Sequence, residues 1–339
     1  MNKIEDLYIV EVKKDSLDDL LRNLLPKLLK SKETIITSRG PSFELDGVLL
    51  ELSNPRARIS RTEKRGTIFS CLGELLWYLS GTNSLDFIRY YIPAYSEESE
   101  DGTTIYGAYG PRLFNSPGGD QINNVITLLN NKPHSRRAVI QIFDSRDIEK
   151  NRQEIPCTCI MQFLIREKRL NMYTYMRSND SFIGLPHDIF TFTMIQEIIA
   201  RSLGTGMGKY VHTVGSLHLY LKNTVGVNEF MNEGWQENVS MPSMPERDLW
   251  PSISTLLEIE ASLRAGIIVD IDRYNLDTYW SDLARLLLVY RHFKNHDYRK
   301  AITVRKSIGS DIYSLYIRTK VFPHIRKQAP PEQLPIPTM

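Results

Sequence analysis

Residues 156–188 read PCTCIMQFLIREKRLNMYTYMRSNDSFIGLPHD, and this stretch decides the fold. Within it, 160–165 and 169–176 have the length and the β-branched or aromatic content of strands, and a third such run lies at 138–143. A helical pattern follows over 188–202. Strands mixed with long helices predict an α+β domain, with one large mixed sheet and flanking helices.

Over the whole chain, the pattern predicts a main domain at 1–240, which includes this stretch, and a helical extension at 245–339. The first part contains an amphipathic helix over 16–32, strands around a turn at 43–52, an apolar helix over 67–80, mostly loop over 83–120, a helix over 121–129 and a strand at 217–221. A proline-containing linker is expected at 242–251. Beyond it, apolar residues at helical spacing predict two helices, 276–294 and 311–328.

The composition excludes several classes of protein. A net charge of +2 over 339 residues gives no general case for a nucleic acid or an anionic membrane as partner. No run of about 18 apolar residues predicts a membrane-spanning helix, and no secretory signal pattern is present. Three cysteines are too few for a disulfide framework and are typical of a cytoplasmic protein. The histidines have no ligand spacing beside the cysteines, so no metal site is expected.

Candidate functional residues lie in short motifs that are weak singly. They are P-H-S-R-R at 133–137, P-C at 156–157, R-S-N-D at 177–180, G-L-P-H-D at 184–188 and H-L-Y at 218–220. Upstream lie E-L-L-W-Y-L-S-G-T-N at 74–83 and I-Y-G at 105–107. Together, in this order and at these separations, they resemble the thymidylate synthase superfamily over roughly residues 30–225. The resemblance implies a thymidylate synthase-like fold and a pyrimidine nucleoside monophosphate as substrate.

Cys157 is the nucleophile that the resemblance implies. Carbon 5 of a pyrimidine is a poor nucleophile until a thiolate adds to carbon 6, and Cys157 would supply that thiolate. A free thiol with a pKa near 8.5 is mostly protonated at neutral pH, and we expect nearby arginines to lower this pKa.

The resemblance also implies roles for other residues. Arg39, Arg177 and Ser178 would bind the phosphate, because guanidinium groups bind phosphate oxygens bidentately. Arg136 and Arg137 would reach the phosphate in the neighbouring subunit, which implies a homodimer with shared active sites. His218 and Tyr220 would bind the sugar hydroxyls. Three residues are expected at the reaction centre. Glu74 would be a buried glutamate with a raised pKa that organises water and protons. Tyr106 would lie beside the reacting atoms, and Asp180 would form hydrogen bonds with the backbone near the base.

This sequence departs from the family pattern at four places. Asp188 stands where thymidylate synthases carry asparagine. The loop at 90–95, Y-Y-I-P-A-Y, lacks the tryptophan involved in reduction by the folate. His187 replaces an aromatic residue, while Thr158 and Ser216 replace histidine and aspartate. No recognisable C-terminal segment closes over the folate.

Asp188 bears on which base is bound. A carboxylate would be repelled by the carbonyl of uracil but accepts well from the amino group of cytosine. The first two departures therefore favour 5-hydroxymethylation of dCMP or CMP with 5,10-methylenetetrahydrofolate, in which water rather than hydride completes the reaction. The missing closing segment argues against any folate-dependent reaction. Three alternatives stay open: a thymidylate synthase acting on dUMP, a non-catalytic or regulatory nucleotide-binding protein, and an Asp188 that only caps the helix after it.

Overall fold

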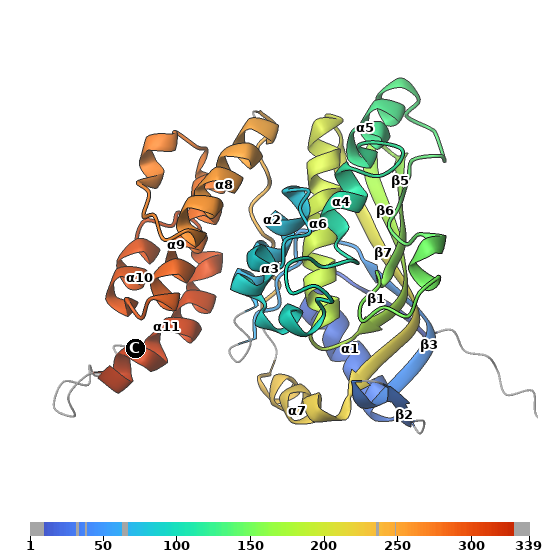
Figure 1. The fold of residues 1–339 in the computed structure, drawn as a ribbon, viewed down its shortest axis with the longest axis horizontal. Coiled ribbons are helices and arrows are strands. Elements are labelled where there is room, and N and C mark those ends of the chain that lie inside the picture. The colour runs from blue at the N-terminus through green and yellow to red at the C-terminus, as the bar shows by residue number, and fades with distance from the viewer. Residues whose placement is uncertain are drawn as a thin grey trace, which may run out of the picture. The chain divides into compact units, whose positions relative to one another are not determined.

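The chain folds into two compact units (Figure 1). The computed structural model describes residues 10–31, 34–37, 39–62, 67–234, 237–247 and 249–328. Unit 1 comprises Met1–Ser60 and Glu74–Met241, and unit 2 comprises Arg61–Gly73 and Pro242–Met339. The boundary therefore falls inside a helix, and 61–73 joins unit 2, which the sequence pattern did not predict.

One mixed sheet forms the centre of unit 1. In the described part of the chain the strand order is β1-β3-β7-β6-β5-β4, with β2 paired to β3. The pairs β1–β3 and β6–β7 are parallel and the others are antiparallel. The strands are β1 Val10–Lys14, β2 Thr34–Thr37, β3 Gly40–Leu52, β4 Val139–Gln141, β5 Thr158–Arg166, β6 Arg169–Asp180 and β7 Gly206–Tyr220. The predicted α+β class with a large mixed sheet is confirmed.

Helix α6, Gly184–Ser202, connects the parallel strands β6 and β7. Two parallel neighbours require such a crossover, since a tight turn can join only antiparallel strands. Figure 1 shows α6 lying along these strands, and its residues are buried on almost every side. The helix begins four residues before the predicted start at residue 188.

The other elements of unit 1 surround the sheet and α6. Ser16 is the N-cap of α1, since its hydroxyl accepts from the Asp19 N–H at 3.2 Å. The expectation of mostly loop over 83–120 is wrong in part, because short helices leave too little periodicity to read. The elements are α1 Leu17–Leu29, α2 Ile68–Leu79, α3 Leu85–Tyr91, η1 Pro93–Glu97, α4 Tyr109–Phe114, α5 Gln121–Asn131, η2 Ser145–Ile148, η3 Leu221–Asn223 and α7 Thr224–Asn232.

Unit 2 is helical. Helix α9 contacts both α8 and α10, and α11 contacts α10. Helix α8 begins at Leu249, inside the expected linker 242–251, so the predicted end of the linker lies too far along the chain. The elements are α8 Leu249–Arg264, η4 Ile271–Tyr274, α9 Thr278–Lys294, α10 Tyr298–Arg305, η5 Asp311–Tyr313 and α11 Ser314–Gln328.

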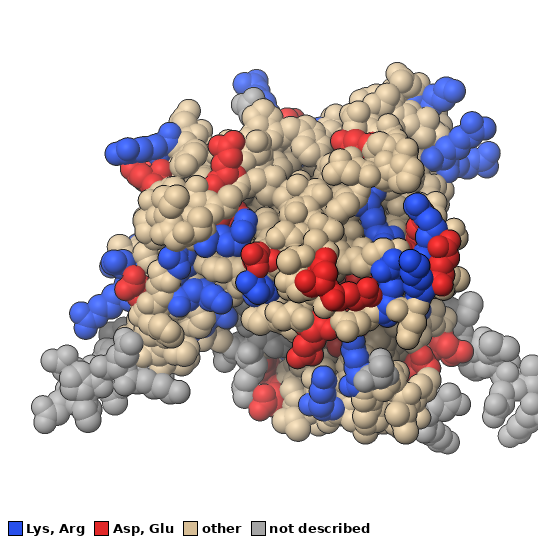
Figure 2. All heavy atoms as spheres, in the orientation of Figure 1, with Lys and Arg blue, Asp and Glu red and all other residues tan. Residues whose placement is uncertain are grey.

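Figure 2 shows Lys and Arg interspersed with Asp and Glu on the face in view, which agrees with the small net charge of +2. In the described ranges, no helix has both the length and the apolar character needed to cross a bilayer.

A buried ion pair fixes α6 within unit 1. Arg58, from the segment after β3, bonds Glu197 of α6, and neither side chain is exposed. Removing one partner of such a pair leaves an uncompensated charge in the interior, which is more destabilising than removing both.

We therefore predict that Glu197→Leu lowers the free energy of unfolding by about 3–5 kcal/mol, measured by urea denaturation. The double variant Arg58→Met/Glu197→Leu should recover a large part of this loss. Asp86→Ala, which removes a surface pair with Arg89, is the control and should cost less than about 1 kcal/mol. Additive effects in the double variant would contradict the pairing.

Candidate active site

The site residues meet at one edge of the sheet. Because β6 and β7 are parallel, their carboxyl ends lie at the same edge, and Asp180 pairs in register with His218. Strand β5 runs antiparallel to β6, so its start lies there too, and the Arg177 N–H donates to the Cys157 carbonyl at 2.9 Å. Topology thus brings together the motifs at 156–157, 177–180 and 218–220.

The Cys157 thiol lies directly before β5, in contact with Arg177. The Arg177 guanidinium lies 3.7 Å from Sγ and donates to the carbonyls of Pro156 and Ile155 at 2.9 and 3.1 Å. Burial nevertheless raises the pKa of Cys157 to about 11, while Arg177 acts in the opposite direction. The expectation of a lowered pKa is wrong for the protein without nucleotide, because desolvation outweighs the single adjacent guanidinium.

Asp188 lies inside α6, as the fifth residue of the helix. It cannot be the N-cap, a position that Ile183 occupies, so the interpretation of Asp188 as a cap is wrong. Its Oδ2 accepts from Asn179 Nδ2 at 2.5 Å, and Asn179 is itself buried. Burial, followed by the charge of Glu74, raises the pKa of Asp188 well above its usual value. Both effects favour the protonated form of Asp188 over the ionised form.

Glu74 is buried in a group of aromatic residues. Tyr95 donates to Glu74 Oε1 at 2.8 Å, and Tyr78 lies 3.4 Å from the same oxygen. Burial and the Glu74 charge raise the pKa values of both tyrosines, so both phenols stay protonated and act as donors. The interior position agrees with the expectation for Glu74.

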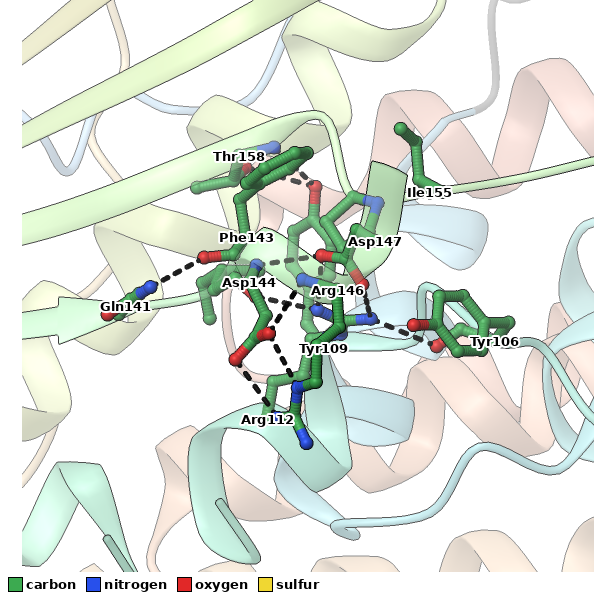
Figure 3. A network of polar contacts seen from close by, with 12 residues as sticks. Tyr106, Tyr109, Arg112, Gln141, Phe143, Asp144, Arg146, Asp147, Ile155 and Thr158 are labelled. Carbon is green, nitrogen blue, oxygen red and sulfur yellow. Dashed lines mark hydrogen bonds and ion pairs between the residues drawn. The ribbon is translucent and has the colours of Figure 1, made fainter. Parts of the chain in front are cut away.

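Tyr106 and Tyr109 lie in different surroundings. The Tyr106 ring stacks under Arg152, with 3.5 Å from the guanidinium carbon to the ring centre. Figure 3 shows Tyr106 beside the network in which Arg112 binds Asp147 bidentately, at 2.7 and 2.8 Å. Tyr109 instead bonds both the N–H and the hydroxyl of Thr158, each at 3.0 Å.

Tyr109 is therefore a residue at the nucleophile that the sequence analysis missed. Its pKa is raised well above the usual value by burial and then by the Cys157 charge. Its only sequence signal is its place in Y-G-A-Y, three residues after Tyr106.

The residues expected to bind sugar lie beside Ser178 and Asp180. Ser178 Oγ lies 3.5 Å from His218 Nδ1, and the His218 and Tyr220 rings meet edge to face at 4.9 Å. Asp180 Oδ1 accepts from the backbone N–H groups of Phe182 and Ile183 at 2.8 and 3.1 Å. Burial lowers the pKa of His218, partly opposed by Asp180, so the ring is neutral at neutral pH.

The arginines expected to bind phosphate divide into two sets. Arg177 lies at the thiol, and Arg39 forms an ion pair with Glu98 at 2.6 Å. Arg136 and Arg137 are exposed before β4, and neither guanidinium pairs with a carboxylate of the described residues. The single chain therefore does not bring this second set to Cys157 by any contact.

Glu154 is a second residue that the sequence analysis missed. It lies three residues before Cys157, and burial, then Glu98, raise its pKa to about 6. No run or motif marks this glutamate in the sequence. Across the described ranges, no group of three His, Cys, Asp or Glu side chains could hold a metal ion.

One comparison with known proteins identifies the region that contains this site. The family model described as thymidylate synthase matches residues 52–249, more than half of the chain. The match contains Glu74, Cys157, Arg177 and Asp188, and it ends where unit 2 begins its main helical part.

We predict that alkylation of Cys157 in the nucleotide-free protein rises about tenfold per pH unit from pH 7 to pH 10. Only the thiolate reacts, and at a pKa of about 11 its fraction at pH 8 is on the order of one in a thousand. Iodoacetamide labelling, resolved for each cysteine by peptide mass spectrometry, measures this dependence. A plateau near pH 8 would show that the arginines lower the pKa after all.

Proposed function

We propose, from the premise that this chain belongs to the thymidylate synthase family, that it is a 5-hydroxymethylase of dCMP or CMP. At the level of the family, the match supports a transferase that moves a one-carbon unit to carbon 5 of a pyrimidine nucleoside monophosphate. The choice between cytosine and uracil depends on the residue that would contact the hydrogen-bonding edge of the base. Asp188 is that residue, and its presence is the observation on which the finer assignment rests.

A neutral acid at position 188 suits cytosine when its proton is fixed on one oxygen. Asn179 donates to Oδ2, which keeps that oxygen an acceptor and leaves the proton on Oδ1. Oδ1 can then donate to N3 of cytosine while Oδ2 accepts from the 4-amino group. Uracil would direct its N3–H at the Oδ1 hydroxyl and its carbonyl at an acceptor.

The remaining residues suit covalent catalysis on such a base. Cys157 would add to carbon 6, and Arg177, already 3.7 Å from its sulfur, would stabilise the thiolate. Arg39 and Ser178 would bind the phosphate, and His218 and Tyr220 the sugar. Glu74, Tyr106 and Asp180 keep the roles that the family implies, and Tyr109 would hold the backbone beside Cys157.

Water as the final reactant is supported by the loop at 90–95. This loop lacks the tryptophan of thymidylate synthases, and its last residue, Tyr95, donates its hydroxyl to Glu74 Oε1. The loop thus contributes a hydrogen-bonding group, and polar walls retain water.

Methylenetetrahydrofolate is the cofactor that the family generally uses, and the residues present fit it at one edge. Its pteridine ring offers N–H donors and a flat apolar face. Asp180 Oδ2 makes no hydrogen bond with the described residues, and the adjacent Ile183 is 50% exposed. We propose that these two side chains hold the cofactor, which when bound supplies the one-carbon unit.

Measuring tritium release from carbon 5 together with the mass of the product tests the proposed function. With [5-³H]dCMP or CMP and methylenetetrahydrofolate, we expect release and a hydroxymethyl product. Cys157→Ser should abolish release and keep nucleotide binding within about tenfold, or 1.4 kcal/mol. A methyl product from dUMP would establish a thymidylate synthase, and binding without release would establish a nucleotide-binding module.

Replacing Asp188 should change which base is bound. We expect wild type to prefer cytosine over uracil nucleotides by tenfold to a hundredfold, since one mismatched buried hydrogen bond costs about 1–3 kcal/mol. Calorimetry should show the preference moving toward uracil in Asp188→Asn. Asn179→Leu, which frees the proton of Asp188, should reduce the preference without reversing it. An unchanged ratio in Asp188→Asn would refute the assignment.

We also propose a homodimer in which Arg136 and Arg137 complete the partner's site. The sheet supports it, since Val139, Ile160 and Tyr175 of β4, β5 and β6 are each about 40% exposed. Ile160 pairs in register with both Gln141 and Tyr175, so these strands leave adjacent apolar side chains uncovered.

Mixing two inactive proteins tests this arrangement. Cys157→Ala and Arg137→Ala chains should regain up to about a quarter of wild-type activity after subunit exchange. About half of the dimers are then mixed, and one of the two sites in each mixed dimer has both an intact Cys157 and an intact Arg137. Arg166→Ala, on an exposed side chain, is the control and should stay active alone. A monomer by light scattering would exclude the shared site.

A further inference from the structure

We propose that Glu154 is the general base that activates water for attack on the one-carbon group at carbon 5, an assignment that rests on the proposed hydroxymethylation. The sequence motifs assign no role to Glu154. Its place, its contacts and the charges around it each support the assignment.

The backbone holds Glu154 close to the nucleophile. Arg177 binds the two carbonyls that separate Glu154 from Cys157, those of Ile155 and Pro156, and the same guanidinium contacts the Cys157 sulfur. One rigid side chain thus fixes the whole segment 154–157. The Glu154 charge acts on the Cys157 thiol and on the Tyr95 phenol, raising the pKa of each.

The carboxylate of Glu154 lies against the backbone of Gly107. A Cβ atom at Gly107 would lie 2.0 Å from Glu154 Oε2, so only glycine leaves room for the carboxylate there. The Gly107 backbone lowers the pKa of this carboxyl, yet Oε2 is buried and has no hydrogen-bond partner among the described residues. A buried acceptor without a partner is costly, and a water molecule is the smallest donor that could satisfy it.

The charges around Glu154 suit a group that accepts a proton and returns it. Burial raises the Glu154 pKa, Glu98 raises it further, and Arg112 of α4 and Arg39 lower it; the resulting pKa is about 6. The Glu154 charge acts in turn on Cys157 and Tyr95. At neutral pH most Glu154 is ionised and ready to take a proton, and a base with a pKa near the working pH is the most effective.

In the proposed step, water adds to a methylene group on carbon 5 while Glu154 takes its proton. After carbon 5 has received the one-carbon unit and the carrier has left, the nucleotide has an exocyclic methylene at carbon 5 and a bond from Cys157 Sγ to carbon 6. Water oxygen bonds to the methylene carbon and gives a proton to Glu154. The electron pair of the exocyclic double bond re-forms the 5,6 double bond as the carbon–sulfur bond breaks, releasing Cys157 as thiolate.

The reverse of this step needs no folate and gives a direct test. Incubating 5-hydroxymethyl-dCMP or 5-hydroxymethyl-CMP with the protein in H₂¹⁸O should place ¹⁸O in the hydroxymethyl group, as mass spectrometry of the nucleotide would show. Glu154→Gln should slow this exchange roughly a hundredfold or more. Folate-free exchange of the carbon 5 hydrogen of dCMP or CMP reports Cys157 addition and should stay within about threefold of wild type.

Two further variants and the wild type complete the experiment. Glu149→Gln changes an exposed glutamate nearby and should leave both exchanges unchanged, whereas Gly107→Ala should displace the Glu154 carboxylate and slow ¹⁸O exchange selectively. Equal ¹⁸O exchange in Glu154→Gln and wild type, or an equal loss of both exchanges in Glu154→Gln, would overturn the role of Glu154 alone. Absence of ¹⁸O exchange in wild type would overturn the hydroxymethylation itself.

Discussion

Desolvation of ionisable groups around Cys157 is the constraint on which the rest of the site depends. Burial raises the pKa values of Cys157, Asp188 and Tyr109, because each would carry a negative charge away from water. Few cations compensate: Arg177 contacts the thiol, and Arg39 is paired with Glu98. Burial therefore favours the protonated forms of the Cys157 thiol, the Asp188 carboxyl and the Tyr109 phenol.

The sheet topology explains why these groups share one place. Strands β6 and β7 are parallel and end at the same edge, and helix α6 starts from that edge after a turn closed by Asp180. Asn179, the last residue but one of β6, thereby reaches Asp188 in the first part of α6. A strand end and a helix start, both well packed, hold the Asp188 side chain, and the proposed discrimination between bases requires such rigidity.

Much of the fold and part of the site could be predicted from the sequence. Strands β5 and β6 and helix α6 have clear periods, and the motifs around Cys157, Arg177 and Asp188 are recognisable by order and spacing. Tyr109 and Glu154 could not be predicted, because their proximity to Cys157 arises from packing between segments that no local pattern records.

The thiol pKa shows the same limit on prediction. Counting arginines near Cys157 in the sequence predicts a lowered value, but the burial that opposes them is a property of the folded chain. For Asp188, the start of the helix decides the role. A helix that began just after residue 188 would make Asp188 its cap, whereas the observed start at Gly184 places Asp188 inside the helix. That difference of one turn lies within the usual uncertainty of helix boundaries read from a sequence.

The proposed choice of cytosine depends on a proton that Asp188 keeps at neutral pH. The most direct measurement is a pH titration by ¹³C NMR of protein labelled at aspartate carboxyl carbons, with Asp188→Asn used to assign the signal. The account predicts that the Asp188 carboxyl stays at its protonated chemical shift through pH 7 in the absence of nucleotide. A midpoint near the ordinary aspartate pKa of 3.8 would contradict it.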